Sequence, residues 1–384
     1  MAMDFSLTEE QRAIVDLAAR FAEKEIAPRV RDYDREERFP LEIYEMMGGL
    51  GLTGGVVPER YGGAGMSHVT YALMIMELAR HCQALAGAAS WASGIAGIAV
   101  LTYGTEDQKL RYLKPLAEGR GPVAFALTEP HTGSDVASLR TRAIRTQGGY
   151  ILRGSKIWVS MIGTCRWMIA LATLDPALGR KGLTAFILEP GSKGLACRPF
   201  SNKLGFRPME TGEVVFDDVF VPEENRLGAE GEGFRVAMCA VENGRLGVAA
   251  RCVGMIRGCL EESISYARDR VTFGEAIASR QLIQSKITDM AVWHETARLL
   301  VLRLAALKDA GERGREHASM TKMYASDMAM RAAEHAMQVH GAYGASDEYH
   351  VGRFFRDAKL MQVIEGTNEI HRTLVAEYAL GLRN

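Results

Sequence analysis

Apolar residues recur at helical spacing in the first third of the chain. A first helix is expected after Thr8, because Thr8 and Gln11 have the spacing of a capping box, and Pro28 limits its extent. Its apolar face would be formed by Ile14, Leu17 and Phe21. Similar spacing predicts further helices over Leu41–Met47, Tyr71–Leu78 and Asp107–Leu116.

The pattern changes between Pro122 and Pro222. Short runs rich in Val, Ile, Phe, Trp and Thr alternate there with Gly, Pro and Asp, which is typical of strands joined by turns. The clearest predicted strands are Trp167–Thr173, Leu183–Leu188 and Glu213–Phe216. This segment is therefore predicted to be a β domain.

Helical periodicity returns after the glycines at 228, 231 and 233. Steps of three and four residues connect Ile283, Ile287, Met290, His294, Ala297, Val301 and Leu304, as in a long bundle helix. Helical sequence continues over Ser319–Val339 and from Glu369 to the end. We therefore predict a mainly α, multidomain α+β protein, with an α-helical domain over 1–121, a β domain over 122–230 and a helical domain over 231–384.

Composition adds little to this prediction. The 46 basic and 47 acidic residues leave a formal charge of -1, which gives no support for a nucleic-acid or membrane partner. Six cysteines without a CxxC pair favour a reducing compartment, and the N-terminus lacks the pattern of an export signal, so we expect a cytoplasmic protein. The uncharged stretch Cys82–Thr105 is rich in Ala, Gly and Ser, which favours a buried helix over a membrane span.

Several kinds of chemistry lack their sequence signals. The cluster Gly228-Ala-Glu-Gly231-Glu-Gly233 has the wrong spacing for a Rossmann fingerprint and does not open a βαβ unit. Metal-ligand spacing, HExxH and GxSxG are absent as well, so we predict no metal site and no serine nucleophile.

Three segments could carry a site. Phe125–Asp135 is a loop dense in hydroxyls and N–H groups that could hold a phosphate or a flavin edge, or could be an ordinary turn. Lys156–Ser160 would place Trp158 and Ser160 on one face of a strand, although a Trp on a strand is usually core. Val363–His371 sets Glu365 among apolar neighbours, where desolvation would raise its pKa as suits a base; alternatively, it could accept N–H bonds at a helix N-terminus.

Taken together, and over essentially the whole chain, these segments resemble the acyl-CoA dehydrogenase family. The resemblance rests on A-L-T-E-P-H-T-G-S-D at 126–135, K-I-W-V-S at 156–160, K-L-G-F-R at 203–207, D-D-V-F-V-P at 217–222, G-E-G-F at 231–234, R-V-T-F-G at 270–274 with Gln281, Q-V-H-G-A-Y-G at 338–344, and R-D-A-K at 356–359 leading to I-E-G-T-N-E-I-H-R at 364–372. It implies an N-terminal α domain, a β-barrel-like middle domain and a C-terminal four-helix bundle, assembled as a homotetramer that binds FAD.

The resemblance also implies site residues. Those expected to bind FAD are Phe125, Thr128, Ser134, Trp158, Ser160, Arg270, Thr272, Phe273, Gln281, Gln338, Ala342, Thr367 and Glu369, with the group from Arg270 to Gln281 contacting the distal part of FAD across a subunit boundary. Glu365 matches the catalytic base, and Ser134, Glu242 and Arg245 match substrate-binding positions. Some relatives take their base from the position before that Arg, which is Gly244 here and cannot ionise.

The implied reaction is α,β-dehydrogenation of an acyl-CoA thioester to the trans-2-enoyl-CoA, with electrons passed to an electron-transferring flavoprotein. Alternatives within the fold are an oxidase or related flavin enzyme that uses oxygen, a reductase, or action on a carrier-protein thioester. A non-catalytic acyl-CoA-binding protein is an alternative of another class. The acyl group is left open: small residues over 84–93 suggest room in the pocket, whereas Trp91 could close it.

Overall fold

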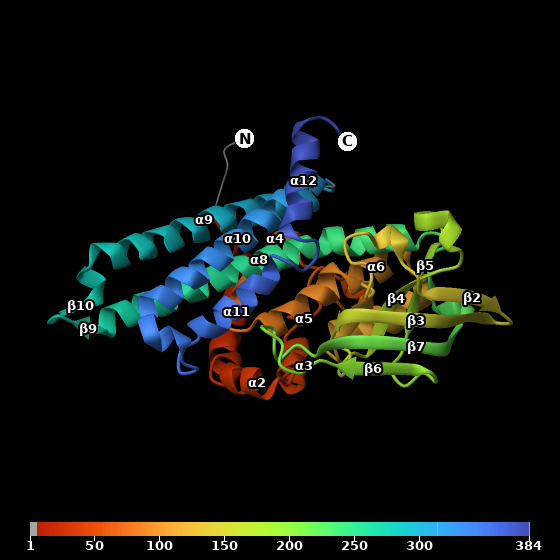
Figure 1. The fold of residues 1–384 in the computed structure, drawn as a ribbon, viewed down its shortest axis with the longest axis horizontal. Coiled ribbons are helices and arrows are strands. Elements are labelled where there is room, and N and C mark those ends of the chain that lie inside the picture. The colour runs from red at the N-terminus through yellow and green to blue at the C-terminus, as the bar shows by residue number, and fades with distance from the viewer. Residues whose placement is uncertain (1–5, 313, 384) are drawn as a thin grey trace.

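The computed structural model describes residues 6–312 and 314–383, and its first third is helical (Figure 1). Thr8 caps the first helix with both reciprocal hydrogen bonds to Gln11, so the predicted capping box is confirmed. The helices of this part are α1 (Glu9–Phe21), which continues as a π-helical turn over Ala22–Ile26, α2 (Val30–Glu36), α3 (Leu41–Gly49), α4 (His68–Ala79), α5 (Gln83–Gly94), α6 (Ala96–Tyr103) and α7 (Glu106–Ala117).

A mixed eight-stranded sheet follows at the other end of the molecule (Figure 1). Its strands are β1 (Val123–Ala126), β2 (Arg142–Thr146), β3 (Gly149–Ser160), β4 (Trp167–Thr173), β5 (Leu183–Leu188), β6 (Leu195–Pro199), β7 (Thr211–Pro222) and β8 (Arg226–Leu227). The order is β6-β7-β3-β2-β4-β5-β8, with β1 added parallel to β4. β4 and β5 match their predicted bounds because both are buried along their whole length, which gives a continuous apolar run.

Long helices form the C-terminal part. α8 (Gly233–Asp269), α9 (Gln281–Asp309), α10 (Arg315–His340) and α11 (Val351–Met361) lie side by side, and α12 (Asn368–Ala379) projects from them (Figure 1). A small hairpin of β9 (Val271–Thr272) and β10 (Glu275–Ala276) joins α8 to α9 at the tip farthest from the sheet. The predicted stripe on α9 is buried at Met290, Ala297, Val301 and Leu304. Helices on both sides of one β segment confirm the predicted fold class.

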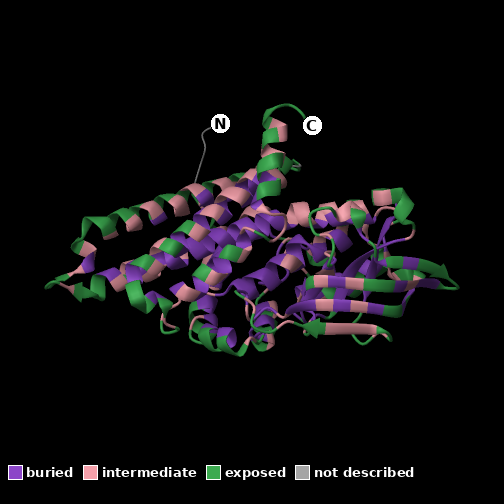
Figure 2. Cartoon of the chain, in the orientation of Figure 1, coloured by how far each residue is buried: buried purple, intermediate pink, exposed green. Residues whose placement is uncertain are grey.

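The uncharged stretch after Cys82 is an interior segment. Gln83–Tyr103 is long and apolar enough to cross a membrane by length and composition, but 83% of its apolar window is buried inside the protein. It is also broken into α5 and α6 at Ile95. Figure 2 shows this region as part of the buried centre, which confirms the predicted buried helix.

A buried ion pair fixes the loop after β1 against β3. Lys156 Nζ lies 2.7 Å from Glu129 Oε1, and both side chains are almost wholly buried. Glu129 also accepts the backbone N–H groups of Arg140 and Thr141. Burial lowers the pKa of Lys156 to about 8, while the charge of Glu129 opposes this change. Because the Glu129 carboxylate accepts hydrogen bonds from several donors, the Glu129–Lys156 pair holds the loop in one conformation.

Removal of the Glu129 charge is expected to destabilise the protein. Glu129→Gln leaves the Lys156 ammonium buried without a counter-charge, which should lower the free energy of unfolding by about 3–5 kcal/mol. Chemical denaturation measures this change. Glu189→Gln breaks a surface pair with Arg111 and is the control, with an expected loss of no more than about 1 kcal/mol. Equal losses for both variants would contradict the structural role of the buried pair.

Candidate active site

The loop between α11 and α12 carries a half-buried glutamate in a strained conformation. Glu365 has φ 52°, in the left-handed region that non-glycine residues rarely adopt. Two buried side chains hold the loop there. Lys322 Nζ donates to the carbonyl of Gly366 at 2.8 Å, and His371 Nε2 lies 3.3 Å from the carbonyl of Glu365. The backbone of the loop is therefore fixed from both sides, which aims the Glu365 side chain inward.

The Glu365 carboxylate is desolvated. Its Oε2 atom is buried and has no hydrogen-bond partner among the described residues. Burial raises the pKa of Glu365 to about 7, against the opposing charges of Arg251, Lys322 and Arg245. The helix α12 is capped instead by Thr367, whose hydroxyl accepts the N–H of Ile370. The alternative of a carboxylate that merely caps a helix is thus wrong, and Glu365 has the properties of a general base.

Gly244 on α8 makes room for this carboxylate. A Cβ atom at position 244 would lie 2.3 Å from Glu365 Oε2 and 2.8 Å from Ile95 Cγ1. Gly244, which has no side chain that could ionise, therefore lies directly beside the carboxyl group of Glu365.

The next residue on α8, Arg245, is buried and incompletely paired. Its Nη1 donates to Ser319 Oγ at 3.3 Å, and its Nε has no partner in the described part of the chain. Glu242 is instead engaged by Arg315, with 3.0 Å between carboxylate and guanidinium. Of the two residues predicted to bind substrate here, Arg245 retains a free donor near Glu365, whereas Glu242 lies in an ion pair.

The loop of 126–135 and β3 form a second group of predicted residues. The N–H of Ile157 donates to the carbonyl of Thr128, which joins the loop to the strand. A register shift between Lys156 and Val159 bulges β3, and Trp158 takes φ 59°. As a result Trp158 is 62% exposed rather than part of the core, and the regular alternation assumed for Trp158 and Ser160 does not hold. Half-buried Ser160 pairs with Thr211 Oγ1 at 3.1 Å, while Ser134 is exposed and Phe125 half-buried.

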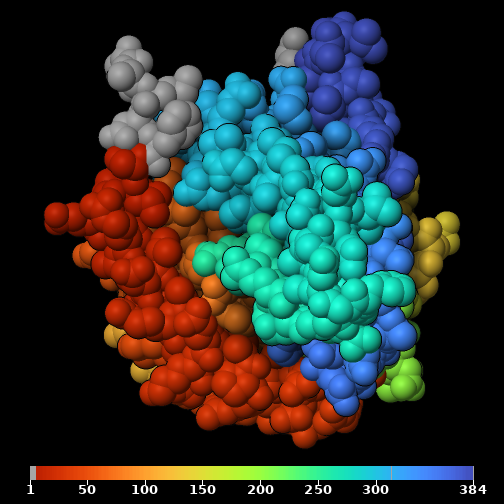
Figure 3. Space-filling view, turned by 90° about the vertical axis from the view of Figure 1, so that its left-hand side faces the viewer, coloured from red at the N-terminus to blue at the C-terminus, as the bar shows by residue number. Residues whose placement is uncertain are grey.

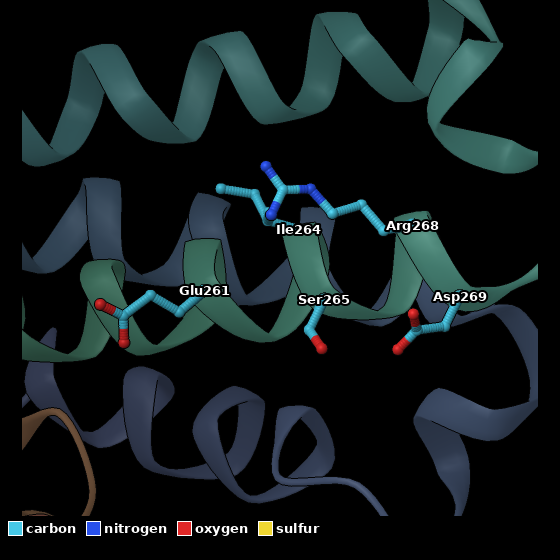
Figure 4. A pocket seen from close by; sticks show the side chains of 5 residues that line it. All are labelled: Glu261, Ile264, Ser265, Arg268 and Asp269. Atoms are coloured by element: carbon cyan, nitrogen blue, oxygen red, sulfur yellow. The ribbon is translucent and has the colours of Figure 1, made fainter.

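The third group lies at the far end of α8. The Arg270 guanidinium is 5.6 Å from the centre of the Tyr343 ring, and both line a hollow with Tyr266 and His340. A neighbouring hollow lies on the last turns of the same helix, where Glu261, Ser265 and Asp269 point to one side (Figure 4). Phe273, on the hairpin, is 97% exposed. Figure 3 views the molecule from this end, where the hairpin and α9 form the foreground.

The remaining predicted residues near this end are solvent-accessible. Thr272 is half-buried, and Gln281, Gln338 and Ala342 are exposed. Glu369 is exposed as well, but it lies at the start of α12 rather than at this end. The predicted residues thus lie in three groups, and the group around Arg270 is far from Glu365 because most of α8 separates Arg270 from Gly244. Four residues around Glu365 were given no role by sequence reasoning: Ile95, Arg251, Lys322 and His371. The apolar setting of the 363–371 segment indicated a buried acid, but no local pattern marks residues that reach it from other helices.

Comparison with known proteins accounts for the whole length of the chain. Family models match three successive segments: acyl-CoA dehydrogenase N-terminal domain over 8–120, middle domain over 124–219 and C-terminal domain over 231–380. The chain is 43% identical over 375 residues to an acyl-CoA dehydrogenase of Bacillus subtilis, covering 98% of this chain and 99% of that protein. It is 37% identical to the caffeyl-CoA reductase-Etf complex subunit CarC of Acetobacterium woodii, covering 96% and 98% of the two chains.

Solved structures agree in fold. Butyryl-CoA dehydrogenase from Megasphaera elsdenii superposes with a TM-score of 0.95 at 38% identity, covering 98% of this chain and all of the other. A glutaryl-CoA dehydrogenase in complex with glutaryl-CoA superposes with a TM-score of 0.96 at 36% identity, covering 99% of this chain and 98% of the other. A glutaryl-CoA dehydrogenase from Mycobacterium smegmatis in complex with FADH2 gives 0.93 at 28% identity, covering 98% and 95%.

The close approach of Gly244 to the Glu365 carboxylate leads to a test. Gly244→Ala should displace that carboxylate and lower the free energy of unfolding by about 1–3 kcal/mol, because the overpacked interior is rigid. Denaturation curves measure the change, and a crystal structure of the variant should show Glu365 moved. Gly49→Ala, in a helix with nothing within 4 Å of the new methyl group, is the control and should be neutral or slightly stabilising. An unmoved carboxylate in a fully stable Gly244→Ala variant would refute the packing argument.

Proposed function

Because the chain belongs to the acyl-CoA dehydrogenase family and is an FAD-dependent oxidoreductase, we propose that it dehydrogenates an acyl-CoA thioester between Cα and Cβ with Glu365 as the base. The observation that carries this assignment is the buried, unpartnered Oε2 of Glu365. A carboxylate in bulk water is too weak a base for an α-proton, whereas burial brings the pKa of Glu365 to about 7. The product would be the trans-2-enoyl-CoA.

The chain's own residues fit FAD in two respects. Trp158 presents an exposed indole from the bulge of β3, which suits stacking against a flat ring. Arg270 carries an exposed guanidinium that forms no ion pair among the described residues, which suits a pyrophosphate. When bound, the flavin supplies the acceptor for the β-hydrogen and its electron pair. Glu365 takes the α-proton at its carboxylate, and the surrounding helices exclude water from that step.

A second copy of the chain is proposed to complete the cofactor site. Gly244, beside the base, and Arg270 are separated by 26 residues of α8, or about 39 Å along the helix axis. This span exceeds the length of an extended FAD molecule, so one flavin cannot reach Glu365 and Arg270 of the same chain. Phe273 and Leu282, which are 97% and 81% exposed, offer an apolar contact for the partner copy. We therefore propose a homotetramer in which the distal FAD groups are exchanged between chains.

An electron-transferring flavoprotein is the proposed electron acceptor. One solved structure, from work on the electron transferring flavoprotein of Acidaminococcus fermentans, is 39% identical to this chain with a TM-score of 0.96, and the relative CarC is a subunit of an Etf complex. The matched family segments support the proposed domains 1–121, 122–230 and 231–384. The cytoplasm remains the proposed compartment.

The role of Glu365 can be tested directly. Glu365→Gln should retain FAD and bind acyl-CoA, yet reduce the flavin at least about a hundredfold more slowly, because the amide cannot accept the α-proton. Anaerobic loss of the oxidised flavin absorbance measures the rate. Glu377→Gln, which removes a partly exposed carboxylate on α12, is the control and should react normally. Normal reduction by Glu365→Gln would end the proposal, and rapid reoxidation of the reduced wild type by air alone would favour the oxidase alternative.

The raised pKa of Glu365 predicts the pH dependence. Since only the ionised carboxylate accepts a proton, kcat/KM should fall about tenfold per pH unit below the pKa and level off above it, with the midpoint near the pKa of about 7 in the free enzyme. Stopped-flow rates over the range in which the protein is folded give the profile. A midpoint near the ordinary glutamate value of 4.5 would show that the base is solvated during catalysis.

A further inference from the structure

A second buried cation lies on α8 beyond the base. Arg251 is 0% exposed, and its Nη2 has no hydrogen-bond partner in the part of the chain that the structure describes. Among the described residues, its side chain makes one hydrogen bond, from Nε to Gln83 Oε1 at 3.2 Å, and its guanidinium lies 5.0 Å from the centre of the Phe206 ring. No described carboxylate forms an ion pair with it, although a buried guanidinium is costly without one.

Helices α5 and α8 pack antiparallel between the base and this arginine, with small residues in contact. A Cβ at Gly94 would lie 3.6 Å from Gly244 Cα, and one at Gly247 would lie 3.0 Å from Ser90 Cβ. At the far end, a Cβ at Gly87 would lie 3.2 Å from Arg251 Cζ. Gly87 thus allows the guanidinium to lie against α5, at the opposite end of the same interface from Glu365.

The spacing along α8 sets the reach of a ligand. Arg251 follows Gly244 by seven residues, which is about two helical turns and about 10 Å, on the same face of the helix. Arg251 is also the first of the charges that oppose the raised pKa of Glu365, so the two groups lie within electrostatic reach. A short acyl chain whose Cα faces Glu365 would therefore end near the unpaired guanidinium.

From this geometry we propose that Arg251 binds a carboxylate at the far end of the acyl group, so that the substrate is the CoA thioester of a short dicarboxylic acid. This inference rests on the proposed dehydrogenation. An anion brought by the substrate supplies the missing partner of a buried guanidinium, whereas a terminal methyl group would leave the cation unpaired. Gln83 holds the arginine by its Nε, which leaves Nη2 for the ligand.

The test compares thioesters of equal length that end in carboxylate or methyl. Anaerobic flavin reduction is measured with glutaryl-CoA against valeryl-CoA and with adipyl-CoA against hexanoyl-CoA. The wild type should favour at least one dicarboxylyl ester by tenfold or more in kcat/KM. Arg251→Met should lower the ratio of kcat/KM for that ester to kcat/KM for its methyl counterpart about a hundredfold, and Arg251→Lys should recover part of this loss. Both rates are taken on the upper plateau of the pH profile, so that a change in the pKa of Glu365 affects both esters alike.

Other outcomes separate the two proposals. If the wild type reacts readily with valeryl-CoA or hexanoyl-CoA and does not prefer either dicarboxylyl ester, the carboxylate subsite is refuted and the dehydrogenation stands. If no acyl-CoA reduces the flavin, the proposed function itself fails. If Arg251→Met slows all esters equally and shifts the pH midpoint, Arg251 only positions or tunes Glu365, which also overturns the inference.

A control variant addresses stability. Arg353→Met removes another buried arginine with an unpartnered Nε, on α11, and should leave the ester preference unchanged. Should Arg251→Met fail to fold or to retain FAD, the wild-type preference and the ester selectivity of Arg251→Lys still decide the question.

Discussion

The site depends on keeping one carboxylate dry while three cations surround it. Arg251, Lys322 and Arg245 each favour the ionised form of Glu365, yet burial outweighs them and raises its pKa to about 7. Without these charges a fully desolvated carboxyl would stay protonated and could not act as a base near neutral pH; without burial it would be too weak a base. The balance between burial and charge is what would allow Glu365 to serve as the proposed general base.

The cations are themselves held by the elements that shape the loop. Lys322 donates to the carbonyl of Gly366 and to Asn368 Oδ1, so the residue that tunes the carboxylate also fixes its backbone. His371 faces the other carbonyl of the loop, and burial lowers its pKa to about 3, which keeps the ring neutral. A protonated histidine there would add a fourth cation. Positive φ at Glu365 is tolerated because these contacts determine the conformation from both sides.

The sequence predicts those features that depend on local pattern. Strands β4 and β5 were found to their end residues because they are buried throughout, and the capping box at Thr8 because its chemistry is local. The bulge in β3 escaped prediction, since the extra residue is defined only by its pairing with β7. Arg251 was missed for a related reason: a charged residue in a helix normally faces solvent, and its burial follows from the contact of Gly87 with α8. The roles assigned to the cofactor-binding residues came from family resemblance, which periodicity could not have supplied.

Helix α8 relates the separate parts of the proposed site. It begins beside the sheet, passes Glu365 at Gly244, carries Arg251 two turns later and ends at Arg270 beside the exposed hairpin. A single rigid helix fixes the distance from the base to both other groups, and the two distances have different consequences. The distance of about 10 Å from Gly244 to Arg251 is within the reach of one acyl chain, whereas the distance of about 39 Å from Gly244 to Arg270 is longer than one FAD molecule. In the proposed arrangement, the same helix therefore restricts the acyl group within a chain and, at its other end, requires a second chain to complete the flavin site.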